Sequence, residues 1–338
     1  MTGDESIGTA DTMRERGNSP GIRLLALMRV DRLVLTAVLA LVVFFGFVVA
    51  VTVLEPPLAD QIESGDMIDT MFSSMITVIV TGSTLVVSIG QLVLSQEDGP
   101  LGDQRRRMSD TMDFRGYTAE LLDGTTPADP SALLREIVQV TAERAEALRD
   151  TLLENDDQQV RTEIDEFTQS VIGNAEEVTE QLDGAKFGTF DVLFAALNFN
   201  YSWKIFQVER IATDHADQLD ETDRRLLDEL KTALSLFGPA REHVKTLYFQ
   251  WELIGFSQWT LYTAVPALIV AGVMLGVVDA GTFPGETVGV ANVVWVVGGA
   301  FAVTLVPFLL FVSYLLRILT VAKRTLAIGP LILRESQR

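Results

Sequence analysis

Four long uncharged segments dominate the pattern of hydrophobic and polar positions along the chain. They cover residues 33–54, 70–96, 253–278 and 287–316. Each is long enough to cross a hydrocarbon core of about 30 Å as a helix that rises about 1.5 Å per residue. The pattern therefore predicts an all-α, polytopic membrane protein in which two transmembrane helical hairpins flank a cytoplasmic helical domain.

The second uncharged segment carries a continuous polar stripe. Eight hydroxyl or amide side chains recur at steps of three or four residues, which places them on one face of a helix. The eight are Thr70, Ser74, Thr77, Thr81, Thr84, Ser88, Gln91 and Ser95. The stripe either lines a pore, or packs against another helix, or is polar by chance. Its continuity over eight positions is the observation that supports a pore lining.

The third and fourth segments contain residues that shape and pack helices. Pro266 and Pro307 are expected to kink their helices, because proline removes one backbone hydrogen bond. Gly272 and Gly276 form a G-x-x-x-G pair, which predicts close helix packing within one protomer or between two. No Asp, Glu, Lys, Arg or His occurs in any of the four segments, which argues against a proton-coupled mechanism.

Charged residues orient the predicted helices. Residues 55–69 hold five acidic side chains and residues 279–286 hold two, and neither stretch contains Lys or Arg. Basic residues instead lie at the other ends of the four segments, as at Arg105, Arg106 and Arg107. By the positive-inside rule, both termini and the long middle segment face the cytoplasm and the hairpins cross the cell membrane.

This orientation divides the chain into five parts. The expected parts are a cytoplasmic N-terminal tail (1–31), a first transmembrane hairpin (32–97), an acidic cytoplasmic helical domain (98–252), a second transmembrane hairpin (253–317) and a cytoplasmic C-terminal tail (318–338). The two transmembrane hairpins are therefore expected to be surrounded by the lipid bilayer.

The middle of the chain is strongly acidic. The 338 residues carry 46 acidic and 26 basic side chains, which give a formal charge of −20. Residues 97–252 hold 33 of the acids and 16 of the bases, and therefore a charge of −17. This excess argues against binding to nucleic acid, and with only five lysines in the chain it indicates a halophilic protein.

Two local signals predict helices in the acidic segment. Asp129-Pro130 is typical of an N-cap followed by proline at the first helical position. From Val160 to Leu182, apolar residues recur every three or four positions, which predicts a helix that ends near Gly184.

Further along, Phe187–Ile211 is rich in aromatic residues and is expected to form a buried helix, with a position on the membrane surface as the alternative. Asp191, Lys204 and Glu209 argue against a fifth membrane span there. A helix over Thr222–Phe237 is expected next, followed by a break at Gly238-Pro239. Beyond that break the apolar spacing continues directly into the third uncharged segment.

Motifs typical of catalysis are missing from the sequence. The chain has no Walker loop, dinucleotide-binding glycine fingerprint, nucleophile elbow or His-Glu-x-x-His zinc motif. It has no Cys, and His215 and His243 lack the spacing of metal ligands. We therefore expect neither an enzyme nor a bound cofactor or metal.

The layout of two hairpins around a helical segment resembles that of bestrophins, pentameric anion channels whose second span lines the pore. Bestrophins carry a paired-Trp signature and an acidic calcium clasp where this chain reads GPLGDQRRRM and AIGPLILRESQR. The stretch SIGQLVLSQEDGPLGDQRRRM looks more like a four-span membrane protein family of halophilic archaea, a resemblance that implies no activity.

These observations lead to one leading hypothesis and two alternatives. The leading hypothesis is a homo-oligomeric passive ion channel lined by the polar face of the second segment. The first alternative is a membrane-anchored interaction or sensory protein whose acidic cytoplasmic domain recruits a protein partner. An ion-coupled carrier is the third possibility.

Overall fold

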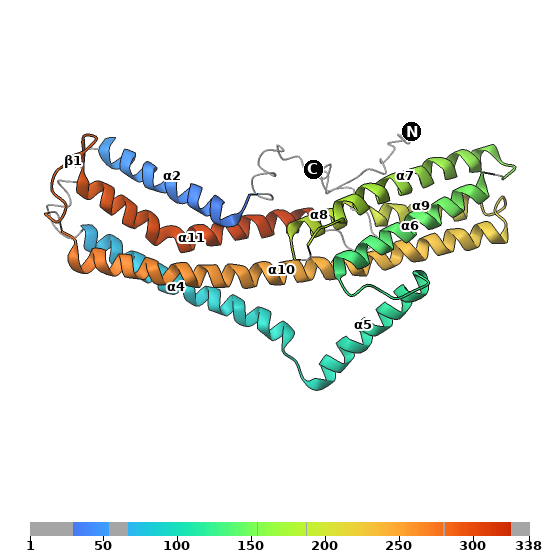
Figure 1. The fold of residues 1–338 in the computed structure, drawn as a ribbon, viewed down its shortest axis with the longest axis horizontal. Helices are drawn as coiled ribbons and strands as arrows, with labels where there is room; N and C mark the ends of the chain where they lie inside the picture. The colour runs from blue at the N-terminus through green and yellow to red at the C-terminus, as the bar shows by residue number, and fades with distance from the viewer. Residues whose placement is uncertain (1–29, 54–66, 154, 187, 280, 326–338) are drawn as a thin grey trace. The chain divides into compact units, whose positions relative to one another are not determined.

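The computed structural model describes residues 30–325 except 54–66, 154, 187 and 280 (Figure 1). Apart from one short strand pair, the regular elements of this part of the chain are helices. Four are long and apolar enough to cross a membrane, as the sequence predicts. They are α2 (Arg32–Val53), α4 (Met67–Glu97), α10 (Glu221–Val277) and α11 (Asn292–Thr325).

The fourth apolar helix begins five residues later than its uncharged segment, because a small hairpin precedes it. Strands β1 (Glu286–Thr287) and β2 (Val290–Ala291) pair in antiparallel register. Val288 and Gly289 connect them with φ values of 56° and 72°, as a type I′ turn requires at both central positions. Strands of two residues are too short to produce an alternating pattern, so the sequence did not reveal them.

The expected break at Gly238-Pro239 is wrong, because α10 passes through it as one helix of 57 residues. The glycine serves close packing instead. A Cβ placed on Gly238 would lie 3.0 Å from Cε2 of Tyr201, so the tyrosine ring occupies the space of the missing side chain. The guanidinium of Arg241, one turn later, lies 4.8 Å from the centroid of the same ring.

The expected helix over Phe187–Ile211 is two helices in the structure, α8 (Phe190–Asn198) and α9 (Tyr201–Asp214). Asn200 starts the second helix, since its side-chain oxygen accepts a hydrogen bond from the backbone N–H of Trp203. Phe199, in the connection, is fully buried and packs edge-on against Phe237 with ring centroids 4.8 Å apart. Local capping and burial therefore interrupt what the sequence presents as one apolar run.

The chain folds into two compact units, and α10 contributes to both. The apolar unit contains the described residues of Gly21–Asp98 and Gln250–Thr320. Within it, α2 approaches α11 closely at Gly298, where a built Cβ would lie 3.0 Å from Cδ1 of Phe47. Phe256 of α10 packs against Phe311 of α11 with ring centroids 5.6 Å apart.

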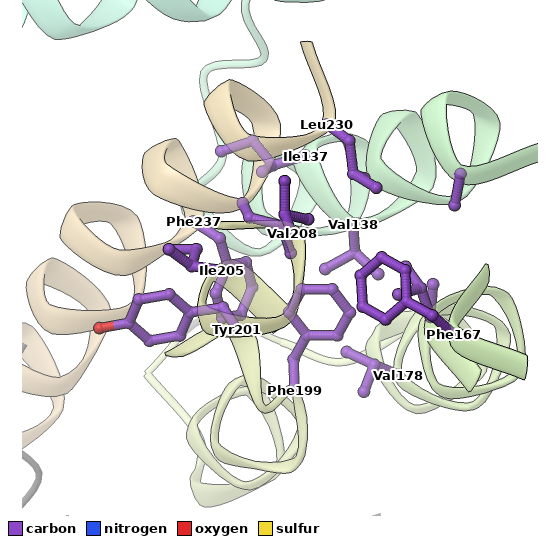
Figure 2. Close-up of a cluster of buried hydrophobic side chains, with 14 of the residues drawn as sticks. Ile137, Val138, Phe167, Val178, Phe199, Tyr201, Ile205, Val208, Leu230 and Phe237 are labelled. Carbon is purple, nitrogen blue, oxygen red and sulfur yellow. The ribbon is translucent and has the colours of Figure 1, made fainter. Parts of the chain in front are cut away.

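The acidic unit centres on Gly99–Phe249. It contains α8, α9, the first part of α10, α5 (Leu101–Leu121), α6 (Pro130–Leu152) and α7 (Gln158–Leu182). Figure 2 shows apolar side chains from α6, α7, α9 and α10 pointing toward one another in its core. The side chain of Asp129 accepts hydrogen bonds from two backbone N–H groups of α6, and Gly184 has a φ of 68° just after α7. The predicted N-cap and helix end are both confirmed.

Candidate functional site

Helix α4 packs into the apolar unit through one row of apolar side chains. The row consists of Ile68, Phe72, Ile79, Val86 and Val93, all of them buried. Phe72, with no exposed surface, clusters with Ala271 and Met274 of α10. Val86 clusters with Phe256 of α10 and Leu310 of α11. The protomer therefore fixes which side of α4 faces inward.

The polar stripe lies on the opposite side of α4. At roughly 100° per residue, the mean direction of the stripe is about 180° from that of the buried row. No member of the stripe belongs to the buried core: Thr70, Ser74, Thr77, Thr81, Thr84, Ser88, Gln91 and Ser95 are exposed or partly exposed. Within the described residues of the protomer, the stripe is thus not the face by which α4 packs against its neighbours.

Two rows of exposed apolar side chains flank the stripe. One row is Val78, Leu85 and Leu92, and the other is Val80, Val87 and Leu94. Each row repeats every seven residues, which keeps its members on nearly the same side of a helix. Helix α4 therefore has four sides, one buried, one polar and two exposed and apolar.

Several stripe hydroxyls are hydrogen-bonded to the helix that carries them. The Oγ of Ser74 donates to the carbonyl of Thr70 at 2.7 Å, and the Oγ1 of Thr84 donates to that of Val80 at 2.9 Å. The Oγ of Ser88 does the same toward Thr84 at 3.1 Å. A carbonyl can only accept, so these hydroxyl protons are engaged and the oxygen lone pairs remain for other partners.

The glycine pair of α10 faces away from the described part of the protomer. Cβ atoms placed on Gly272 and Gly276 would meet nothing within 4 Å, and both residues are exposed. Of the two predicted uses of this pair, packing within the protomer is not seen in the described residues. The close approach occurs instead at Gly298 of α11, which the sequence analysis missed although the adjacent Gly298-Gly299 pair was a visible signal.

Both prolines singled out in the sequence lie inside continuous helices, Pro266 in α10 and Pro307 in α11. A kink at either position remains a prediction. Pro266 is exposed, whereas Pro307 is buried and borders a cleft between α4, α10 and α11 with a volume of about 350 Å³. Thr77 and Thr81 of the polar stripe also line this cleft.

A buried charged cluster joins three apolar helices at one end of the apolar unit. Arg32 of α2 forms an ion pair with Glu252 of α10, whose side chain is 4% exposed. The Arg32 guanidinium also lies 4.9 Å from the centroid of the Tyr314 ring of α11. Sequence reasoning treated these charges as flanks of the uncharged segments, and no spacing could have paired residues that lie 220 positions apart.

The acidic unit contains a second group that the sequence analysis missed, the fully buried Lys204. Its Nζ donates to Oδ1 of Asn174 at 2.6 Å and lies 4.7 Å from the centroid of the Phe199 ring. Burial lowers the pKa of Lys204 from 10.5 to about 7. Asn174 in turn donates to the carbonyl of Asn198, whose side chain donates to Gln181, so the lysine belongs to a buried polar network.

His215 contacts the ion pair between Arg210 and Glu163. The Nε2 of His215 lies 2.7 Å from Oε2 of Glu163, and Arg210 pairs with the same carboxylate. Among the described residues, no group of three or more His, Cys, Asp or Glu side chains is arranged to hold a metal ion.

Comparison with known proteins places the chain in one family. A model of a family of unknown function (DUF7972) matches residues 1–338. No match was found among curated proteins or among solved structures. The expectation of a family without an assigned function is confirmed, whereas the halophilic source and the likeness to bestrophins remain hypotheses.

Proposed function

We propose that this chain, which belongs along its whole length to that family of unknown function, is a multi-pass membrane protein that forms a homo-oligomeric passive ion channel. The outward face of α4 lines the pore. The observation that carries the proposal is the position of the whole polar stripe on the side of α4 opposite its buried row.

The four sides of α4 match what a pore-lining helix needs. Such a helix packs on its own protomer with one side, faces water with the opposite side and meets neighbouring copies with the flanks. The rows around Leu85 and Val87 supply two apolar flanks of the right kind. A helix that merely anchors the chain in lipid has no need of eight polar positions on one outward side, because lipid offers them no partners.

The hydrogen bonding of the stripe favours cations as the transported ions. Hydroxyl protons bonded to carbonyls of the same helix leave oxygen lone pairs facing outward, as at Ser74, Thr84 and Ser88. Oxygen atoms with partial negative charge can replace part of the hydration shell of a cation. A pore lined in this way differs from the anion pore that the bestrophin resemblance implies.

The orientation of the channel follows from the distribution of basic residues. We propose that residues 97–252 and both termini lie in the cytoplasm, with the turn around Asp279 outside the cell. The acidic unit then stands on the cytoplasmic side, where its charge raises the local concentration of cations.

Flux through reconstituted protein tests the proposal. Purified protein in liposomes is expected to pass K⁺ in preference to Cl⁻. Replacing Thr84 by Leu narrows the pore and should reduce flux at least several-fold, and Thr84→Lys should shift the reversal potential toward that of Cl⁻. Thr52→Leu is the matched control, since this exposed α2 hydroxyl also bonds to its own helix, at 2.9 Å from the Val48 carbonyl.

Oligomeric state is measured on the same samples by cross-linking. If the stripe is a packing face, Thr84→Leu overpacks a contact and weakens assembly by roughly 1 to 3 kcal/mol. Wild-type liposomes that pass no ion under any salt gradient or voltage, together with loss of assembly in Thr84→Leu alone, refute the channel.

The second candidate function is recruitment of a protein partner by the acidic unit, with the apolar helices as an anchor. The carboxylates on the outer side of α7 support it, among them Glu176, Glu177 and Glu180. A surface of this charge suits a basic segment of another protein. Absence of flux combined with salt-sensitive retention of a basic partner favours this function over the channel.

A further inference from the structure

One residue on the wall of the cleft between α4, α10 and α11 carries a buried hydroxyl that has no hydrogen-bond partner among the described residues. The Oγ1 of Thr260 is buried and makes no hydrogen bond within the described residues. The residue is 3% exposed and lies on the wall of the cleft. Thr260 also lies seven residues inside the third uncharged segment, about 10 Å along the helix, where lipid offers no hydrogen-bonding partner.

Hydroxyl groups near Thr260 in the apolar unit do form hydrogen bonds to their own helices. Ser257 donates to the Leu253 carbonyl at 2.8 Å, and Thr263 donates to that of Trp259 at 2.9 Å. Thr304 of α11, which also lines the cleft, donates to the Phe301 carbonyl at 2.8 Å. An unsatisfied buried hydroxyl destabilises a folded protein, so a group that does not bond to its own helix is expected to have another partner.

The rest of the cleft is suited to an apolar molecule. Its volume of about 350 Å³ falls in the range of small-molecule sites, and most of its wall is aliphatic or aromatic, including Ile79, Val86 and Phe308. A Cβ placed on Gly82, which also lines the cleft, would meet nothing within 4 Å. The space is therefore open on the α4 side.

We propose that this cleft binds a small uncharged amphiphile from the bilayer, with an apolar body and one hydroxyl or carbonyl oxygen that pairs with Thr260. An apolar body suits the aliphatic wall, and one oxygen satisfies the buried hydroxyl of Thr260. A charged group is excluded, because no described residue that lines the cleft carries an opposite charge. The site does not depend on ion conduction. Val78 and Leu85 of its wall also belong to the flank that the proposed channel gives to neighbouring copies, so labelling is measured in the monomer and in the oligomer.

Photolabelling of the full-length protein in liposomes tests the site. The probe is octanol that carries a diazirine, and the comparison probe is the corresponding octane without the hydroxyl. Mass spectrometry should find the alcohol on residues 77–89 and 304–311, and labelling by the alkane should be about 3- to 10-fold weaker. Thr260→Val should reduce labelling by the alcohol to that of the alkane, and Thr260→Ser should restore it.

Two glycine variants separate occupancy of the cleft from adsorption to lipid-facing surfaces. Gly82→Leu fills the cleft from α4 and should abolish labelling by both probes. Gly46→Leu places the same side chain in open space on α2 and should change nothing. Thr263→Val, whose hydroxyl is already bonded to its own helix, should also label like the wild type.

Three results overturn the proposal. Equal labelling by alcohol and alkane, unchanged in Thr260→Val, means that lipid chains occupy the cleft without recognition of an oxygen. Labelling that persists in Gly82→Leu means that the probe binds elsewhere. Labelling that is present in the monomer and lost in the oligomer means that a second copy of the chain covers the cleft.

Discussion

Replacement of Lys204 by Met tests whether a charge is buried in the acidic unit at the expense of stability. The lysine is fully buried, and its Nζ donates a hydrogen bond to Asn174. Burial lowers the pKa of Lys204 in the folded protein to about 7, whereas in the unfolded chain the amine keeps its ordinary value near 10.5. Methionine has a similar length and carries no charge, so the variant removes the titration with little change in volume.

The sign and size of the effect follow from the two pKa values. Between pH 7 and pH 10.5 the unfolded chain holds a proton on Lys204 that the folded protein lacks, so stability rises with pH in that window. The gain from pH 7 to pH 9 is about 2 kcal/mol, and over the whole window it approaches about 5 kcal/mol. Below pH 7 both states are protonated and the contribution stays constant.

Lys204→Met should be more stable than the wild type at the low-pH end of this window and less stable at the high-pH end. At pH 7, Lys204→Met avoids burying a charge and should be more stable. At pH 10 the wild-type amine is neutral in the fold, and the variant should be less stable by about 1 to 3 kcal/mol because Asn174 loses its donor. The pH-dependent gain should be absent from the variant.

Trp203, next to Lys204 in α9, provides a local probe of unfolding. Replacing Trp251, Trp259 and Trp295 by Phe leaves it as the single tryptophan of the chain. Urea titrations in detergent of this single-tryptophan protein, with and without the Lys204→Met substitution, then give the stability at each pH by fluorescence. Groups that titrate in both proteins cancel in the comparison.

An NMR titration of Lys204 tests directly whether its pKa is lowered in the folded protein. The chain has five lysines, so ¹³Cε labelling gives few enough NMR signals to assign. Titration of Lys204 near its ordinary value of 10.5, or equal pH dependence of stability in wild type and variant, would refute the argument.

Three further predictions concern packing, topology and salt. Gly298→Ala should lower the thermal midpoint in detergent and cost about 1 to 3 kcal/mol of stability, because the added Cβ would lie 3.0 Å from Phe47. Gly46→Ala is the control and should leave the midpoint unchanged, because its Cβ would lie in open space. A cysteine at Asp279 of this Cys-free chain should react with an impermeant reagent in sealed cells, and one at Asp150 should not; labelling of Asp150 contradicts the orientation. Raising salt from 0.1 to 1 M should stabilise the acidic unit against urea, because the distance over which its carboxylates repel one another falls from about 10 to about 3 Å. An unchanged urea midpoint contradicts a halophilic protein.

The sequence by itself determined the features that depend on local composition. Four uncharged segments gave four membrane-length helices, because a helix in lipid satisfies its own backbone and needs only apolar side chains over about 20 residues. The cap at Asp129 and the end of α7 near Gly184 were likewise readable, since each depends on a few adjacent residues.

The sequence also defined the polar stripe, but not the direction in which it faces. That direction is set by the row around Phe72 and Val86, which packs on α10 and α11 and leaves the opposite side of α4 outward. Periodicity identifies a face of a helix, and only the neighbouring helices decide whether that face is buried.

Tertiary structure alone decided which small and charged residues make contacts. Gly298 rather than Gly272 is the site of close approach, because a glycine matters only where another helix comes near. Arg32 and Glu252 meet across 220 positions, and Lys204 is buried among residues of other helices. Pairings of this kind depend on how distant segments pack together, which no pattern within a single helix encodes.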